Sequence, residues 1–196
     1  MGSPLPKFDY VERRCPTNHE GEDMSIEDNQ KSHDKSDSDR QQWLLDRIDI
    51  QDTIARYSLG QDSHQGKDSN ILEQWNETFS DDGTVDYSAA GGPKASYRDL
   101  AHWMRGDKDT AGSMSAFSNW QHMLSLPNVT IHGNTAKART DFFATHRSHA
   151  GEGAQVHFNA AGAFVDDLVR TSKGWRIKFR RLELYFGDPL QVVSMS

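Results

Sequence analysis

The chain has 196 residues, of which 35% are hydrophobic and 10% aromatic, enough for one globular domain with a hydrophobic core and too few for two ordinary domains. A formal net charge of −7 and the scatter of Lys and Arg argue against nucleic acid and anionic membrane as partners. The single cysteine, Cys15, excludes an internal disulfide. Because no stretch has the continuous apolar residues of a signal peptide or a membrane span, we expect a cytoplasmic protein.

The N-terminal residues 1–37 are predicted to form a disordered acidic tail. Residues 17–39 contain only Met24 and Ile26 as apolar side chains among many charges and serines, so burial there cannot offset the conformational entropy lost on ordering. Phe8 and Tyr10, nearer the N-terminus, leave open that this part docks on the domain or on a partner. We expect one ordered domain over residues 38–190 and a short C-terminal tail over residues 191–196.

The first helix is predicted to begin at Ser38, which forms a capping-box pattern with Gln41 ahead of an apolar run. At 100° per residue, one wide stripe faces the interior. Tyr57 and Asp62 project from the same side of the helix rather than toward solvent. The stripe is predicted to comprise Trp43, Leu44, Ile48, Ile50, Ile54, Ala55, Ser58 and Gln61.

The next elements alternate in type. Helical spacing of apolar residues predicts a second helix over residues 69–79, and alternating character predicts a short strand over residues 84–89. A third helix is expected over residues 96–106, where a glycine stops it, and a polar loop follows over residues 106–115.

Four extended segments complete the chain. They span residues 119–126, residues 129–147 with a His-Gly-Asn turn inside, residues 154–170 and residues 174–186. Helices first and strands later indicate an α+β fold, in which a curved, mostly antiparallel sheet carries the helices on one face.

One carboxylate and one histidine stand out as candidate catalytic residues. Strand alternation places His122 on the same face as Trp120, Leu124 and Leu126, which should be the buried face. A buried carboxylate such as Asp62 fixes the tautomer of an imidazole and stabilises its cation, while the other ring nitrogen takes or gives a proton. His64 is a rival base, although the helix is ending there.

These segments together resemble the SnoaL-like polyketide cyclase and dehydratase family, within the nuclear transport factor 2-like superfamily. The matching pieces are "IQDTIARYSLGQDSHQ", "FSDDGTVDYSAAGGPKASYRDLAHWM", "QHMLSLPNVTIHGNTAKARTDFFATHR" and "GWRIKFRRLELYF", and their order covers residues 41–187. The resemblance implies an α+β cone in which a strongly bent sheet wraps N-terminal helices around an apolar pocket. The sequence departs from the family pattern in the insert around residues 106–115 and in the long tail.

The resemblance also implies site residues. The family's catalytic aspartate and histidine fall on Asp62 and His122, and a tyrosine five residues before the aspartate falls on Tyr57. A substrate-binding arginine on the last strand is either Arg180, by its spacing from Trp175, or Arg181, by strand alternation. Further substrate contacts are expected from an aromatic set that otherwise builds the core, namely Trp103, Trp120, Phe142 and Phe158.

The favoured hypothesis is a cofactor-independent dehydratase, isomerase or cyclase for a small apolar secondary metabolite, polyketide-like or terpenoid-like as the resemblance implies. His122 would be the base, Asp62 its charge partner, and Tyr57 a donor to a carbonyl or leaving hydroxyl. Two alternatives stay open: a non-catalytic ligand-binding or protein-interaction module, and an epoxide hydrolase, which needs an Asp-Arg-Asp arrangement.

No metal site is predicted. The pair His146 and His149 lies three residues apart on a strand, so the two side chains point to opposite faces, and no third ligand stands nearby. We expect the domain to assemble as a homodimer or homotrimer, from the family resemblance and from the outer face that a one-sided curved sheet leaves uncovered.

Overall fold

The computed structural model of the chain describes residues 36–65, 70–148, 155–188 and 191–193. The predicted disordered tail lies outside the described residues apart from Ser36 and Asp37, so that prediction stays open. The helices are α2 (Asp37–Ser63), α3 (Leu72–Trp75) and α4 (Tyr97–Arg105), with a 3-10 turn η1 (Ser88–Ala90). The strands are β1 (Phe79–Asp86), β2 (Lys94–Ser96), β3 (Asn119–Leu124), β4 (Asn128–His132), β5 (Thr135–Arg147), β6 (Gln155–Thr171), β7 (Gly174–Gly187) and β8 (Gln191–Val193).

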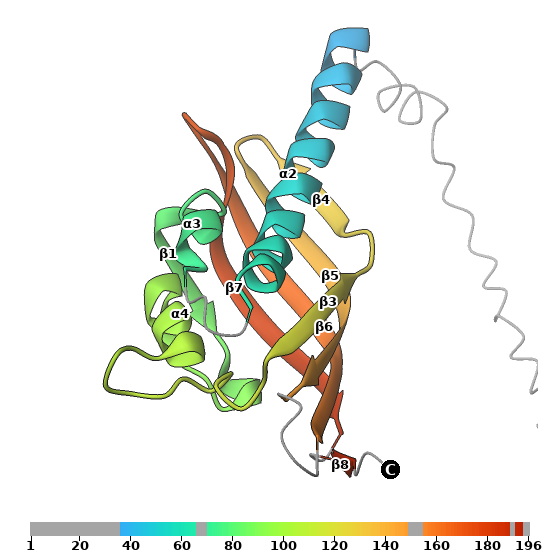
Figure 1. Cartoon of the computed structure of the whole chain (residues 1–196). Helices are drawn as coiled ribbons and strands as arrows, with labels where there is room; N and C mark the ends of the chain where they lie inside the picture. Colours follow the sequence, from blue (N-terminus) through green and yellow to red (C-terminus); the bar gives the residue numbers. More distant parts are fainter. Residues whose placement is uncertain (1–35, 66–69, 149–154, 189–190, 194–196) are drawn as a thin grey trace, which may run out of the picture. The chain divides into compact units, whose positions relative to one another are not determined.

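The strands form one curved, open sheet with the order β2-β1-β7-β6-β5-β3 (Figure 1). β4 also pairs with β5, and β8 pairs with β6, so a strand forms within the segment predicted as a C-terminal tail. Every pairing is antiparallel except that of β1 with β7. The predicted α+β class and mostly antiparallel sheet are therefore confirmed, although the sheet does not close into a barrel.

Helix α2 lies against the concave side of the sheet, and its N-terminal turns extend past the hairpins at that end (Figure 1). The predicted stripe is buried from Ile50 onward, through Ile54, Ser58 and Gln61. The prediction was wrong for Trp43, Leu44 and Ile48, which are 39%, 54% and 52% exposed, and for Ala55, which is also exposed. Helical periodicity identifies the apolar side of α2 but does not indicate where the sheet that covers it ends.

The predicted second helix is much shorter than expected. α3 ends at Trp75, because Thr78 and Glu77 close tight turns back to Trp75 and Gln74 through their backbone N–H groups. The following residue, Phe79, already belongs to β1. Its ring stacks on Tyr97 of α4 with centroids 4.8 Å apart. Aromatic packing thus joins α3, β1 and α4 at one end of the core.

Helix α4 and the loop after it form the wall opposite the sheet. α4 begins with a reciprocal cap between Ser96 and Asp99. At its end Gly106 has a φ of 69°, a conformation that favours glycine, and the chain turns back along the helix. The N–H of Ser113 then donates to the carbonyl of Trp103, and that of Met114 to the carbonyl of Met104, at 2.9 and 3.0 Å.

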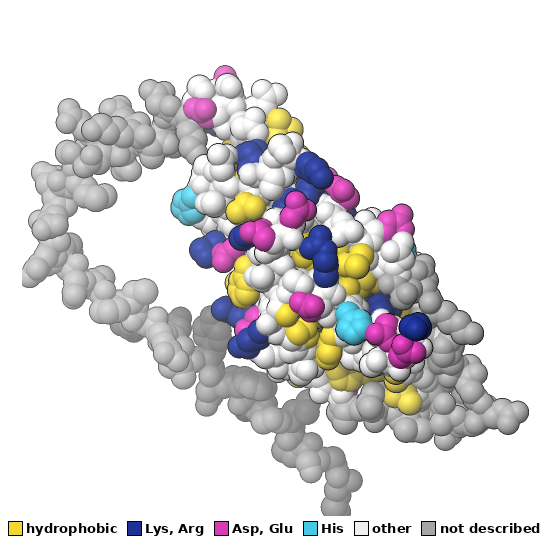
Figure 2. Space-filling model, turned by 90° about the vertical axis from the view of Figure 1, so that its left-hand side faces the viewer, with side chains coloured by type: hydrophobic (Ala, Val, Ile, Leu, Met, Phe, Trp, Pro, Cys, Tyr) yellow, Lys and Arg dark blue, Asp and Glu magenta, His cyan; other side chains and the backbone are white. Residues whose placement is uncertain are grey.

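Surface charge agrees with the composition. On the face shown in Figure 2, Lys and Arg side chains are interspersed with Asp and Glu rather than gathered into a basic patch. Among the helices that the structure describes, none combines the length and the apolar character needed to cross a membrane.

Candidate active site

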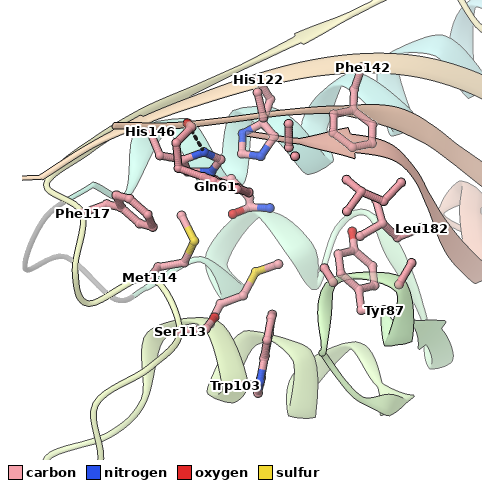
Figure 3. Close-up of a pocket in the computed structure, with 18 of the residues that line it drawn as sticks. Gln61, Tyr87, Trp103, Ser113, Met114, Phe117, His122, Phe142, His146 and Leu182 are labelled. Atoms are coloured by element: carbon pink, nitrogen blue, oxygen red, sulfur yellow. Dashed lines mark hydrogen bonds between the residues drawn. The ribbon is translucent and has the colours of Figure 1, made fainter. Parts of the chain in front are cut away.

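A cavity of about 530 Å³ lies between the concave side of the sheet and the wall made by α4 and its loop (Figure 3). This volume lies in the range of pockets that bind small molecules. Most of the lining side chains are apolar or aromatic, and the described residues that line the cavity include no carboxylate. The polar lining residues are Gln61, Tyr87, Ser113, His122 and His146.

His122 and Asp62 are in direct contact. Asp62 lies in the last turn of α2, and its Oδ1 is 2.8 Å from Nδ1 of His122 on β3. The backbone N–H of His122 donates to the other carboxylate oxygen at 2.9 Å. The His122 side chain is 8% exposed and that of Asp62 23%. With Nδ1 engaged by the carboxylate, Nε2 is the ring nitrogen left for a ligand.

The end of α2 is tied to β3 around this pair. The Gln65 amide donates to the carbonyl of Asp62 at 2.8 Å and to the carbonyl of Trp120 at 2.7 Å. The Trp120 indole N–H donates to the carbonyl of Gln61 at 2.9 Å. These bonds involve the neighbours of both Asp62 and His122, so they hold the carboxylate and imidazole at a fixed separation.

Of the four aromatic residues predicted to contact substrate, three line the cavity: Trp103, Phe142 and Phe158. Trp120 does not; its indole packs under the Arg105 guanidinium, 4.4 Å from the ring centroid, and supports the end of α2. Strand parity placed Trp120 and His122 correctly on the inner side of β3.

Two other residues near the pair are not part of the cavity. Leu126 lies beyond the end of β3 and is 83% exposed, so the prediction that it is buried was wrong. His64, the rival base, is buried but is not among the residues that line the cavity.

Tyr57 lies behind the cavity wall rather than in it. Its side chain is fully buried, and its ring stacks on Trp75 with centroids 4.7 Å apart. Its hydroxyl accepts from the Gln61 amide at 3.2 Å and contacts the hydroxyl of Tyr87, which does line the cavity. Burial raises the pKa of both tyrosines above the usual range, so both are neutral phenols. The hydroxyl that a cavity ligand meets is therefore that of Tyr87.

The two candidate arginines occupy opposite faces of β7. Arg180 is fully buried and forms two hydrogen bonds of 2.7 Å with Asp166, while Arg181 is exposed and pairs with Glu183. Strand alternation favoured Arg181 and was wrong, because the register of β7 against β6 shifts between the partners of Asp167 and Leu168. Neither arginine lines the cavity.

Arg180 lies immediately behind the cavity lining. Its guanidinium carbon is 4.2 Å from the ring centroid of Tyr57 and 4.3 Å from that of Phe164. Burial alone would lower the pKa of Arg180, but the charge and hydrogen bonds of Asp166 raise it above its ordinary value. The guanidinium therefore stays charged beneath the aromatic wall.

His146 is a site residue that the sequence reading missed. It lines the cavity beside His122, with the ring centroids 5.8 Å apart and the planes perpendicular. Nδ1 lies 3.3 Å from the Phe158 carbonyl (Figure 3), so Nδ1–H donates and Nε2 is an acceptor. Burial lowers the pKa of His146 to about 4, helped by the charge of His122, so the ring is neutral at pH 7.

Strand parity could have found His146, because Phe142, Ala144 and His146 alternate along β5 and all are buried. Tyr87, directly after β1, has the same kind of signal, because it shares the parity of the buried Val85 in the segment predicted as a strand. His149 lies outside the described residues. Within the ranges that the structure covers, no three His, Cys, Asp or Glu side chains are grouped closely enough to hold a metal ion.

Comparison with known proteins identifies relatives of the domain. An uncharacterized protein of Mycobacterium tuberculosis is 32% identical over 140 residues, which cover 71% of this chain and 85% of the relative. A Novosphingobium aromaticivorans structure named as a candidate scytalone dehydratase is 18% identical, with a TM-score of 0.58 over 77% of this chain and 91% of that one.

A further solved structure has a similar fold. A type 2 hexachlorocyclohexane dehydrochlorinase is 17% identical, with a TM-score of 0.59 over 82% of this chain and 97% of that one. The SnoaL-like domain family matches residues 42–181, which include most of α2, the whole of β3 to β6, and more than half of β7. With the long helix held against a curved open sheet, these matches establish that the chain belongs to the SnoaL-like domain family and has the nuclear transport factor 2-like fold.

Proposed function

We propose that this protein is a cofactor-independent dehydratase, isomerase or cyclase that acts on a small apolar metabolite by proton transfer at His122. The observation that carries the proposal is the 2.8 Å contact between Asp62 Oδ1 and His122 Nδ1, beside a cavity that His122 also lines. A separation in this range lets a carboxylate orient an imidazole and stabilise its cation. The other ring nitrogen then meets the ligand.

In the elimination version, His122 Nε2 removes a proton from a carbon next to a carbonyl, and the electron pair of that C–H bond forms a C=C bond. The hydroxyl on the neighbouring carbon leaves with its bonding electrons and takes up a proton from the imidazolium, so the products are an alkene and water. Asp62 stabilises the transient imidazolium charge. Tyr87 donates to the carbonyl oxygen, where negative charge develops. Isomerisation and cyclisation use the same first step.

The lining suits an apolar substrate. Rings of Trp103, Phe142 and Phe158 offer flat apolar surfaces, and the few polar groups can orient one or two substrate oxygens. The names of two structural neighbours refer to removal of water and of hydrogen chloride, which supports an elimination-type reaction here. Polyketide-like or terpenoid-like metabolites are the proposed substrates.

A ligand-binding module without catalysis is the main alternative, and the paired acid and imidazole argue against it. Epoxide hydrolysis has less support. Its Asp-Arg-Asp arrangement would have to place an arginine and carboxylates at the cavity, whereas the buried pair Asp166 and Arg180 lies behind the lining.

The test is a screen of the purified 196-residue chain against a panel of hydroxylated ketones of the polyketide and terpenoid classes, with loss of water or a shift of mass or absorbance as the readout. Active substrates are then offered to the His122→Ala variant. His132→Ala, which changes an exposed histidine on β4, is the matched control. Turnover that survives in His122→Ala, or stereospecific binding with no turnover of any ligand, would contradict the proposal.

We also propose that the domain is a homodimer or homotrimer. Met123, Phe143, Ala161 and Phe186 are register partners across β3, β5, β6 and β7 on the outer face of the sheet. Three of them are large and exposed, at 49%, 37% and 54% for Met123, Phe143 and Phe186, and such rows favour association. Light scattering should give a multiple of the chain mass at micromolar concentration, and a monomer mass would refute this.

A further inference from the structure

One side-chain amide and two tyrosine hydroxyls form a series of hydrogen bonds beside the cavity. The Gln61 amide and the Tyr57 hydroxyl are 3.2 Å apart, and the Tyr57 hydroxyl contacts that of Tyr87. Gln61 and Tyr87 line the cavity, whereas Tyr57 lies behind it. Figure 3 shows the Gln61 amide among the side chains that surround the cavity, below His122.

The direction of these hydrogen bonds follows from the orientation of the Gln61 amide, whose nitrogen faces the Tyr57 hydroxyl. The Gln61 nitrogen can only donate, so the Tyr57 oxygen accepts from it. The single proton of Tyr57 then goes to the Tyr87 oxygen, which leaves the Tyr87 proton for the cavity.

The other end of this series of hydrogen bonds, at Gln61, offers a hydrogen-bond acceptor. Gln61 Oε1 is buried and has no hydrogen-bond partner in the part of the chain that the structure describes. Buried polar atoms nearly always have a partner, and one left without is costly. Turning the amide over would reverse every bond in the series. The two ends would still present opposite polarity, because Tyr57 has only one proton to give.

We propose that Gln61 is a specificity-determining residue, whose carbonyl oxygen accepts a hydrogen bond from a hydroxyl or amino group of the ligand while Tyr87 donates to a ligand oxygen. Tyr57 is a positioning residue, which fixes the Gln61 amide without touching the ligand. The substrate class is thus narrowed to apolar skeletons that carry both a donor and an acceptor. This inference rests on the proposed function in one respect: the ligand that Gln61 and Tyr87 bind is taken to be the substrate that reacts at His122.

The test measures binding of two inert probes of nearly equal shape, 2-naphthol and 2-methylnaphthalene, to the full chain by calorimetry. The readout is the ratio of their dissociation constants, which cancels changes that affect both probes alike. Gln61→Met keeps the length of the side chain and removes the acceptor. This variant should raise the dissociation constant of 2-naphthol about tenfold relative to that of 2-methylnaphthalene, the size expected for loss of one buried hydrogen bond.

Gln121→Met is the matched control, because it makes the same change at an exposed glutamine of β3 that does not line the cavity, and its ratio should equal that of the wild type. Tyr57→Phe should move the ratio in the same direction as Gln61→Met by a smaller factor. A merely structural role for Tyr57 would weaken both probes equally and leave the ratio unchanged.

Three results would overturn the proposal: an unchanged ratio in Gln61→Met, a ratio that changes in His122→Leu but not in Gln61→Met, or no binding of either probe to the wild type. The second result would assign the ligand hydroxyl to His122 instead. Neither probe can react, so failure here leaves the proton-transfer test at His122 untouched, and a failed turnover screen leaves the binding ratio measurable.

Discussion

Among the pairs of a carboxylate and a basic side chain that join different elements of this domain, two differ sharply in what surrounds them. Asp62 and His122 meet at the edge of the cavity, with side chains 23% and 8% exposed. Asp166 and Arg180 meet on the inner face of β6 and β7, both fully buried, with the rings of Tyr57 and Phe164 packed against the guanidinium. The shortest contacts are nearly equal, at 2.8 and 2.7 Å.

The two pairs differ in whether the basic side chain can release a proton and whether that proton can reach the cavity. An imidazole titrates near neutral pH and has a second nitrogen on the cavity side, whereas a guanidinium does not lose its proton in proteins. The Asp166 and Arg180 pair is therefore suited to bracing the sheet, and the Asp62 and His122 pair to chemistry. Contact geometry alone does not separate these roles.

The largest expected effect is the loss of turnover when Asp62 or His122 is replaced. His122→Ala should lower kcat on an active substrate by on the order of 10² to 10⁴-fold, because an acid/base group is lost. Asp62→Asn should keep the shape of the contact and lose its charge, with a large fall in kcat and little change in substrate binding. Steady-state kinetics of both single variants and the double variant check this.

The losses at His122 and Asp62 should not add, since both residues serve one proton transfer. The thermal midpoint of each variant should stay close to that of the wild type. Additive losses, or near wild-type kcat in His122→Ala, would mean that the pair is as structural as that of Asp166 and Arg180.

The buried pair should show its effect in stability. Asp166→Asn leaves the Arg180 charge buried without its counter-charge, and this should cost about 3 to 5 kcal/mol of unfolding free energy in a denaturant titration. The double replacement Asp166→Leu with Arg180→Met should cost less than the single one. The neighbouring Asp167→Asn is the control, because its pair with Lys137 is exposed and worth about 0 to 1 kcal/mol. Equal effects at Asp166 and Asp167 would refute the comparison.

Sequence reasoning placed the cavity pair correctly for one physical reason. Side chains alternate strictly along a strand, so His122 had to share the inner side of β3 with Trp120, and the helix wheel put Asp62 on the inner side of α2. Their 2.8 Å separation depends on the bonds of Gln65 and the Trp120 indole between α2 and β3, and no local pattern encodes those.

The same reasoning failed where the ladder is irregular. A register shift in β7 reverses the parity beyond Ile177, so Arg180 turns inward and Arg181 outward. His146 escapes sequence reasoning for a different reason: its spacing from His149 suggests metal ligation, although parity with Ala144 places His146 inside. The exposed apolar residues Trp43 and Ile48 reflect the length of α2 relative to the sheet, which is a tertiary property.

His146 offers a way to sharpen the comparison, because it is a buried histidine that bonds a backbone carbonyl and, among the described residues, no carboxylate. Its pKa is lowered from 6.5 to about 4 in the folded protein, so between these values the unfolded chain takes up a proton that the folded chain does not. Stability should therefore fall as the pH drops from 6.5 to 4, by on the order of 1 to 3 kcal/mol from this group. Denaturant titrations across that range measure the slope.

His146→Gln should flatten the dependence of stability on pH, whereas the control His132→Gln, at an exposed histidine of β4, should leave it unchanged. If the slope stays the same in His146→Gln, the acid sensitivity arises elsewhere. In that case burial would not lower the pKa of His146, which would contradict the neutral state of its ring.

The smallest expected effect concerns the residues that connect the two pairs. Tyr57 has its ring against Arg180 and its hydroxyl on Tyr87, which lines the cavity. Tyr87→Phe removes the donor that meets the substrate and should lower kcat/KM by about tenfold, the effect of one hydrogen bond. Tyr57→Phe should lower it by a smaller factor and destabilise the fold by about 1 kcal/mol, because a buried hydroxyl network is lost. Kinetics and denaturant titrations of both variants measure these effects. The loss in the double variant should be smaller than the product of the two single losses, since Tyr57 acts partly through Tyr87 and partly through the Gln61 amide. A Tyr57→Phe enzyme slower than Tyr87→Phe would mean that Tyr57 itself reaches the substrate, which its complete burial argues against.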